Sequence, residues 1–283
     1  MNTQSLPSTV GRVVLSVADM TRSLDYYQRG IGLQLHRRDN GTAYLGVGGE
    51  DMLILQEKPG ARPARGTAGL YHFALLLPSR RELARTIQHL QTSHTPIGGA
   101  SDHAVSEALY LTDPDGHGIE IYRDRPRHEW EYPNGNLLIN TTPFDADGVM
   151  GALADSEASW TGLHSDTIMG HIHLHVANIP HTELFYTQLL GFDQIARYGA
   201  QASFFSYEGY HHHLGTNTWA GEGAPQALPT MARLEWYELR IRETAVFDHI
   251  RQQLTKTSYP YQQSDEGIRL ADPAGNQMLL SQI

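Results

Sequence analysis

The sequence predicts an α+β protein made by tandem duplication, with four units that each run strand–helix–strand–strand–strand. Two observations show the duplication. A segment that starts at Gly11 recurs 159 residues later at Gly170, with Gly, Leu, Val and Ala kept in place. The same offset carries the Asp-Pro-x-Gly turn at 113–116 onto 272–275. A third observation gives the content of each half, because alternating apolar runs flank a segment with helical spacing.

The first unit begins with an alternating strand, and a helical segment that ends at a glycine follows it. Three short alternating runs then predict strands, which are separated by Asp-Asn-Gly and Gly-Gly turns. In order, the strand, the helix and the three further strands are expected at 10–17, 20–30, 33–37, 43–47 and 52–56.

The second unit repeats this order, and the second half of the chain repeats both units at about 170–219 and 230–283. Its strand, helix and three strands are expected at 71–77, 80–91, 97–98, 107–111 and 118–122. A linker with a short helix near 145–154 joins the halves. We therefore expect an N-terminal domain at 1–125, a linker at 126–168 and a C-terminal domain at 169–283.

A curved four-stranded sheet must bury one face, and pairing two units does so while leaving a cavity between them. Four units therefore predict two paired half-barrels. The alternative is a plain α+β protein that has no site. The unusual histidine content argues against that alternative, since the chain has 16 histidines and no cysteine.

Composition excludes several function classes. A net charge of -10 argues against a nucleic-acid partner or an anionic membrane, because both bind basic faces. The absence of cysteine excludes disulfides, thiolate nucleophiles and iron–sulfur clusters. No apolar run reaches the ~18 residues of a membrane span, and the first seven residues do not resemble a signal peptide. We expect a cytoplasmic protein whose metal sites use histidine and carboxylate.

Two strand residues are candidate metal ligands in the second unit. His72 shares a strand face with Ala74 and Leu76, and Glu120 lies between two isoleucines. An unpaired carboxylate in a buried strand would be costly, so a cation is the obvious partner. Taken singly, His72 could be a core histidine and Glu120 an exposed edge residue.

The third unit adds His171, His173 and His175 on one strand face. They cannot all reach one metal, because that face spans roughly 13 Å, and the repeat singles out His171. The first unit has Arg12 at that position, while the fourth has Met231 or Glu235 in place of His72 and Leu279 in place of Glu120. Only units two and three keep two histidines and one carboxylate, which is the ligand set of a facial triad for Fe(II) or Mn(II). We infer that unit two pairs with unit three, and unit one with unit four.

A run of three histidines at 211–213 lies where the third unit should place a strand. Residues alternate in direction along a strand, so His212 faces opposite to His211 and His213. His212 is a candidate acid/base residue near the metal. The alternative is a surface histidine cluster.

Together these segments resemble the vicinal oxygen chelate superfamily and, within it, the catechol-2,3-dioxygenase-like type I extradiol dioxygenases. The resemblance covers all four units. Asp-Pro-Asp-Gly alone is a weak marker, whereas the whole set is specific for the superfamily. The markers are Gly170-His171, His72-Phe73-Ala74 and the segments 106–122 and 209–219.

The resemblance implies a role for each matching residue. It assigns His171, His72 and Glu120 as ligands of Fe(II), with Mn(II) as the other option. Tyr110 matches the family tyrosine ten residues before the glutamate, and His212 matches the catalytic histidine. His103 is the nearest match to a further catalytic histidine, with spacing that departs by about two residues. The common pattern takes its ligands from units three and four, and this chain departs from it.

The implied reaction is ring cleavage of a small aromatic diol by O2 beside the two hydroxyls. We predict that His173, His211 and Trp219 contact the substrate. Trp236, Tyr210 and Phe205 could line the pocket or belong to the core. A glyoxalase-like or fosfomycin-resistance-like metal enzyme and a non-enzymatic binding protein of this fold are the alternatives. Dimers are common for this fold, so a homo-oligomer is allowed.

Overall fold

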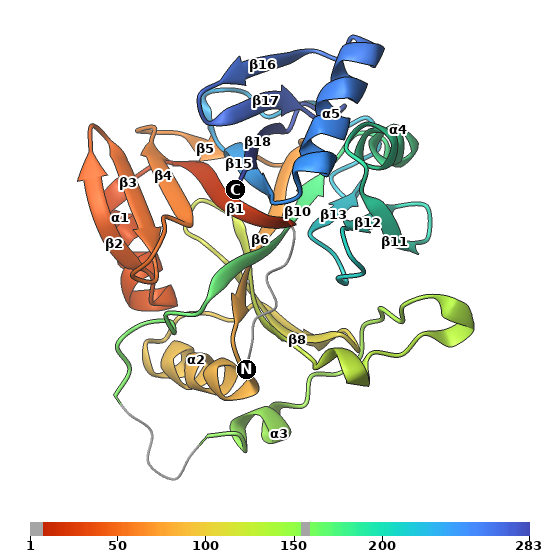
Figure 1. Cartoon of the computed structure of the whole chain (residues 1–283). Coiled ribbons are helices and arrows are strands. Elements are labelled where there is room, and N and C mark those ends of the chain that lie inside the picture. The colour runs from red at the N-terminus through yellow and green to blue at the C-terminus, as the bar shows by residue number, and fades with distance from the viewer. Residues whose placement is uncertain (1–7, 154–158) are drawn as a thin grey trace.

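The computed structural model describes residues 8–153 and 159–283 and contains two eight-stranded mixed sheets (Figure 1). One sheet has the strand order β16-β17-β18-β15-β1-β4-β3-β2, and the other has β11-β12-β13-β10-β6-β9-β8-β7. Each sheet therefore joins one unit from each half of the sequence. The predicted α+β fold of four units is confirmed, as is the pairing of unit two with unit three and of unit one with unit four.

The first two units follow the predicted order. The first helix continues as a π-helix, and Asp19 caps its start by accepting from the backbone of Arg22. In unit one the elements are β1 (Ser8–Val17), α1 (Met20–Asp25), η1 (Tyr26–Ile31), β2 (Gln34–Asp39), β3 (Thr42–Gly46) and β4 (Leu53–Glu57). In unit two they are β6 (Gly69–Leu77), α2 (Arg80–Thr92), β7 (Gly99–Asp102), β8 (Ser106–Thr112) and β9 (Gly118–Asp124). The strand expected at 97–98 thus lies two residues later.

The second half repeats this pattern, with one difference in unit three. The histidine run is a bend, and the strand begins only at Leu214, because the backbone turns through positive φ at Glu208 and Gly209. Unit three contains β10 (Ile168–His175), α4 (Ile179–Leu184), η4 (Phe185–Leu189), β11 (Asp193–Tyr198), β12 (Ala202–Ser206) and β13 (Leu214–Asn217). Unit four contains β15 (Leu234–Ile241), α5 (Thr244–Thr257), β16 (Tyr261–Ser264), β17 (Gly267–Ala271) and β18 (Gln277–Gln282).

Three connections complete the chain. The connection after unit one and the connection after unit three pair with each other as β5 (Arg62–Pro63) and β14 (Met231–Ala232). The linker between the halves runs past β8 (Figure 1) and holds η2 (Arg127–Glu129), η3 (Pro133–Gly135) and α3 (Ala146–Met150). The predicted helix near 145–154 is therefore present, although Ala154 lies outside the described residues. So do the first seven residues, on which the expectation about a signal peptide rests.

The main core joins the two sheets and the helices that pack on them. One contiguous cluster contains Leu15 and Leu239 from one sheet and Phe73 and Ile172 from the other, all of them buried. Residues of opposite direction on the same strands face the concave sides. Among the described residues, no helix has the length and apolarity to cross a bilayer.

The repeated Asp-Pro-x-Gly turns have a structural role. Asp113 accepts hydrogen bonds from its own turn and from the buried Tyr27 hydroxyl of the preceding unit at 2.9 Å. Asp272 does the same for its turn and contacts the Tyr186 hydroxyl at 3.4 Å. Tyr186 lies 159 residues after Tyr27, so the duplication kept both members of a contact that ties two units together.

Gly170 lies in close contact with side chains of the neighbouring strands in the second sheet. A Cβ atom on this residue would lie 2.0 Å from the Tyr122 hydroxyl and 2.9 Å from the Leu76 Cβ. We expect Gly170→Ala to lower the free energy of unfolding by about 1–3 kcal/mol, the usual cost of overpacking. Gly99→Ala, at a strand glycine with open space around it, is the matched control and should change stability by less than about 0.5 kcal/mol. Equal effects in urea denaturation would contradict this account.

Candidate metal centre

Three buried polar side chains meet on the concave face of the second sheet. They come from three adjacent strands, with His72 on β6, Glu120 on β9 and His171 on β10. Ala74 pairs in register with both Glu120 and His171, so these residues point to the same side of the sheet. His72 lies two residues before Ala74 and shares that face. The small Ala74 side chain leaves room between the three.

The donor atoms of these residues form a nearly equilateral triangle. Glu120 Oε2 lies 3.1 Å from His72 Nε2 and 3.3 Å from His171 Nε2, and the two nitrogens are 3.3 Å apart. The side chains are almost fully buried. In the described part of the chain, this is the only set of three or more His, Asp or Glu donors grouped closely enough to hold a metal ion.

This triangle fits a divalent cation. Neighbouring ligands around a metal with bonds of about 2.1–2.2 Å lie about 3.0–3.5 Å apart, for octahedral and for tetrahedral geometry. Two imidazoles and one carboxylate are the donor set of the facial triad. The group therefore has the chemistry and the spacing of a metal site, and neither property selects one metal.

The charge states also suit a cation. Burial lowers the pKa of His72 to about 3, so its imidazole is neutral and can donate an electron pair. Burial alone would raise the pKa of Glu120, but the interactions with His171 and His72 lower it to about 2. The metal-free protein thus holds one carboxylate and a neutral His72 at physiological pH.

The buried histidines predict a loss of stability in acid. Burial lowers the pKa of His72 and His213 to about 3 and lowers the pKa of His173 and His212 well below the usual value. In the unfolded chain these imidazoles have pKa values near 6.5, so acid protonates the unfolded state first. Each of these histidines should therefore lower the free energy of unfolding by about 1–2 kcal/mol as the pH falls from 6.5 to 5.

Urea denaturation of the metal-free protein at pH 7, 6 and 5 tests this expectation. The free energy of unfolding should fall at each step. Asp272 has the opposite effect on the free energy of unfolding. Burial raises its pKa to about 6, so the folded state binds a proton before the unfolded state does as the pH falls. Stability that rises toward pH 5 would contradict the histidine account.

Two members of the cluster, His72 and Glu120, line a cavity of about 350 Å³. This volume is within the usual range for small-molecule sites. Units two and three and the linker all contribute to it. The lining includes five predicted site residues besides His72 and Glu120, namely His103, Tyr110, His173, His212 and Trp219. The His212 ring packs at a tilt against the ring of His171, with 4.2 Å between centroids, so His212 lies between the cavity and the third donor.

His103 and Tyr110 form a hydrogen-bonded pair in this cavity. The His103 Nε2 atom lies 2.6 Å from the Tyr110 hydroxyl, and Nδ1 lies 2.8 Å from the Asn140 carbonyl. A carbonyl only accepts, so the Nδ1 atom of a neutral His103 carries the hydrogen and Nε2 accepts from Tyr110. Burial raises the pKa of Tyr110 well above its usual value. His103 therefore reaches the Tyr110 hydroxyl, although its position in the sequence departs from the family spacing by about two residues.

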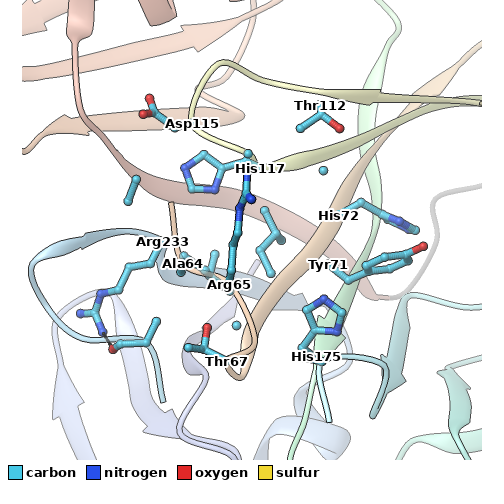
Figure 2. Close-up of a pocket in the computed structure, with 18 of the residues that line it drawn as sticks. Ala64, Arg65, Thr67, Tyr71, His72, Thr112, Asp115, His117, His175 and Arg233 are labelled. Atoms are coloured by element: carbon cyan, nitrogen blue, oxygen red, sulfur yellow. Dashed lines mark hydrogen bonds between the residues drawn. The ribbon is translucent and has the colours of Figure 1, made fainter. Parts of the chain in front are cut away.

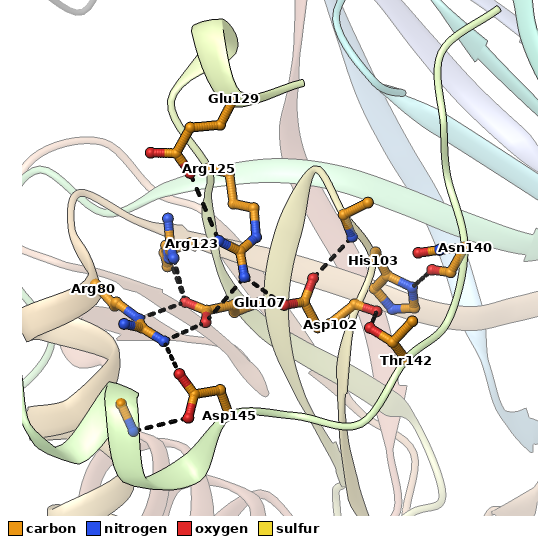
Figure 3. A network of polar contacts seen from close by, with 12 residues as sticks. Arg80, Asp102, His103, Glu107, Arg123, Arg125, Glu129, Asn140, Thr142 and Asp145 are labelled. Atoms are coloured by element: carbon orange, nitrogen blue, oxygen red, sulfur yellow. Dashed lines mark hydrogen bonds and ion pairs between the residues drawn. The ribbon is translucent and has the colours of Figure 1, made fainter. Parts of the chain in front are cut away.

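A buried ionic network fastens the linker that supplies the Asn140 carbonyl (Figure 3). Glu107 is fully buried and accepts two hydrogen bonds from Arg80, at 3.0 and 2.8 Å, and one from Arg123 at 2.6 Å. Arg80 also binds Asp145 of the linker at 2.8 Å. The linker is thus a fixed wall of the cavity, which the sequence did not reveal.

A second cavity of about 410 Å³ adjoins the first (Figure 2). His72, Tyr71 and His175 lie together on one side of it and Arg233 on the other. Tyr71 and Trp219 line both cavities, and their rings meet edge to face at 5.1 Å. Both cavities therefore reach the His72 edge of the metal centre.

Tyr71 is a site residue that the sequence analysis missed. A β-bulge skips it in the pairing of β6 with β10, where Leu70 and His72 have partners. A bulge redirects a side chain, so the Tyr71 ring joins the face of its neighbour and lies 5.0 Å from the rings of both His72 and His173. Strict alternation would have placed it in the core.

Several other expectations need correction. His211 does not line the cavity, because its ring is fully buried behind His212 and contacts Asp124 instead. Phe205 is in the main core, and Tyr210 packs in a separate buried cluster with Trp130. Of the four aromatic candidates, Trp219 alone is in this cavity, with Trp236 in the other sheet.

The first sheet has no matching donor set at the equivalent positions. Arg12 corresponds to His171 and forms an ion pair with Glu238 at 2.9 Å. Glu238 pairs with Leu279 as Ala74 pairs with Glu120, so the residue two before it, Trp236, corresponds to His72. Met231 and Glu235 were therefore wrong choices. The offset at this strand is 164 residues rather than 159, because the connection before it is longer.

Comparisons with known proteins agree with this architecture. Residues 9–121 match the Glyoxalase/Bleomycin resistance protein/Dioxygenase superfamily. A protein of Bacillus subtilis (strain 168), catechol-2,3-dioxygenase, is 40% identical over 269 residues, which cover 93% of each chain. The chain belongs to this superfamily. Within it, the protein is an enzyme of the extradiol dioxygenase class.

Other proteins match less of the chain or only its fold. Metallothiol transferase FosB of Lysinibacillus sphaericus is 25% identical over 126 residues, which are 44% of this chain and 88% of FosB. A putative dioxygenase from Bacillus subtilis superposes with a TM-score of 0.65 at 13% identity, over 97% of this chain and 84% of that one. Glyoxalase I from Zea mays gives 0.58 at 14% identity, over 97% and 92%.

Proposed function

We propose that this enzyme cleaves the ring of a catechol-type diol with O2 at a non-haem Fe(II) centre held by His72, Glu120 and His171. One observation carries the proposal. Three donors lie 3.1–3.3 Å apart, and two of them, His72 and Glu120, line a cavity that is also lined by His212 and Tyr110. The 40% identity to a catechol-2,3-dioxygenase supports the substrate class.

Fe(II) is the favoured metal, and Mn(II) fits the same donor set. When bound, iron would supply a Lewis acid that holds the diol oxygens and a route for electron density from the ring to O2. One carboxylate against a divalent ion leaves one net positive charge. A singly deprotonated diol would neutralise this charge, so the site favours binding that is coupled to the loss of one proton.

His212 would take that proton and later return it. Its ring lies beside His171, where the reacting oxygens would be, and burial lowers its pKa so that the imidazole is neutral before the reaction. An acid/base residue in such a position contributes about 10²–10⁴-fold to the rate.

Tyr110 would orient the diol. Its hydroxyl hydrogen is engaged by His103, so the Tyr110 oxygen can accept a hydrogen bond from a substrate hydroxyl. His103 is held in the required tautomer by the Asn140 carbonyl. We assign His173 and Trp219 to contact with the ring, since both line the same cavity.

The competing chemistry is thiol transfer, which the name of the relative, metallothiol transferase FosB, describes.

A domain division at 1–125 and 169–283, a cytoplasmic location and a homo-oligomer remain predictions. The two sheets each combine both halves of the chain, so we propose that neither half folds alone.

The test is turnover by the full chain after anaerobic loading with Fe(II), Mn(II) or Zn(II) in parallel. With Fe(II), catechol should consume one O2 per ring and give a yellow semialdehyde acid. Zn(II) is the matched control and should bind without O2 uptake. Absence of O2 uptake with Fe(II), together with adduct formation from a thiol and an epoxide, would replace the proposal by the transferase alternative.

A further inference from the structure

Behind His212, a buried chain of hydrogen bonds leads away from the cavity. The Nδ1 atom of His212 lies 2.8 Å from the Nδ1 atom of His211. The Nε2 atom of His211 lies 2.8 Å from Oδ1 of Asp124. His211 is fully buried, and His212 lies between it and the cavity.

The hydrogen positions in this chain follow from its far end. A carboxylate oxygen can only accept, so Nε2 of His211 must carry a hydrogen. In a neutral imidazole the other nitrogen is an acceptor, so Nδ1 of His211 has no hydrogen. Nδ1 of His212 must then donate across the 2.8 Å contact. The Nε2 atom of His212 is left without a hydrogen.

Asp124 is held in place by further partners. The Tyr210 hydroxyl donates to its other oxygen at 3.0 Å, and the Tyr122 hydroxyl lies 2.9 Å from that of Tyr210. The Tyr122 ring packs against His171, with 4.8 Å between centroids. Asp124 is the last residue of β9, the strand that carries Glu120. One strand therefore positions both the candidate ligand Glu120 and the carboxylate that ends this series of hydrogen bonds.

We propose that Asp124 and His211 are positioning residues that fix His212 in the Nδ1–H tautomer and so keep its Nε2 atom free to accept a proton on the catalytic side. The proposal deepens the proposed function, because it rests on His212 acting as the base. When His212 becomes protonated, the neighbouring imidazole and the Asp124 carboxylate would stabilise the charge, as a buried carboxylate does for a catalytic histidine. Neither residue touches the substrate.

Histidine tautomers can be measured without turnover. The full chain, labelled with ¹⁵N-histidine and loaded with diamagnetic Zn(II), gives long-range ¹H–¹⁵N correlations that distinguish Nδ1–H from Nε2–H. We expect Nδ1–H for His212 and Nε2–H for His211 at neutral pH. A hydrogen on Nε2 of His212 would overturn the proposal. This result stands whether or not the enzyme cleaves diols, so it separates failure of the inference from failure of the proposed function.

Variants of adjacent histidines give the second test. His211→Phe removes both hydrogen bonds, so kcat should fall about 10–100-fold with KM within about threefold. His211→Asn keeps an acceptor near the position of Nδ1 and should recover most of kcat. His213→Phe is the matched control, since His213 is equally buried but contacts Ser206 at 3.1 Å and should keep kcat within about threefold.

Equal losses in His211→Phe and His213→Phe would contradict the proposal, because they would reflect packing alone. So would an unchanged kcat in His211→Phe. If that variant fails to fold, the Asn variant and the tautomer spectrum decide. In His211→Asn, a hydrogen on Nε2 of His212 together with full activity would also count against it.

Discussion

His171→Ala should empty the metal centre and stop turnover while the fold remains. The substitution removes one of the three proposed ligands. Protein metal sites bind with a free energy on the order of 10 kcal/mol, so about 3 kcal/mol, or about 100-fold in affinity, should be lost. The metal should then wash out on desalting. Metal content by mass spectrometry, with circular dichroism for the fold, is the measurement.

His175→Ala is the matched control for this prediction. His175 lies on the same strand face four residues later and is bonded to Asn217 at 2.7 Å rather than to the metal centre. It should keep the wild-type metal content. Full metal content in His171→Ala, or equal losses in both variants, would show that His171 is not a ligand.

His212→Phe should slow turnover by about 10²–10⁴-fold while metal content and diol binding remain. Phenylalanine keeps a ring between His171 and Phe204, which lie 4.2 and 5.1 Å from the His212 centroid, but it cannot accept a proton. Single-turnover kinetics with pre-bound catechol isolate the chemical step. His213→Phe, at the next residue of the same bend, is the control.

Normal single-turnover rates in His212→Phe would remove this residue from the mechanism. A loss of metal along with the rate would instead point to a structural role beside His171. The prediction therefore requires that kcat falls, that metal stays and that the dissociation constant for the diol changes by less than about threefold.

Much of the fold could be predicted because its signals are local. Alternation with period two marked most strands, and the repeat offset exposed the duplication. The pairing of units two and three could be predicted because His72, Glu120 and His171 can meet only if those units share a sheet. The distribution of the candidate ligands among the four units therefore predicted which units share a sheet.

The rest depended on local irregularities that periodicity does not register. The bulge at Tyr71 places in the cavity a side chain that strict alternation would point toward the core. A longer connection shifted the register of unit four, so Trp236 rather than Met231 corresponds to His72. His211 was placed in the substrate pocket, although the alternation around His212 already pointed it away. The role of the linker followed only from the contact of Arg80 with Asp145, which are far apart in sequence.

The central claim is that His72, Glu120 and His171 hold one metal ion, and anomalous diffraction tests it most directly. Crystals of the full chain, loaded anaerobically with Fe(II), should give a single strong peak at the iron edge. That peak should lie about 2.0–2.4 Å from both Nε2 atoms and from the Glu120 carboxylate. A fully loaded crystal whose iron peak lies elsewhere would contradict the account.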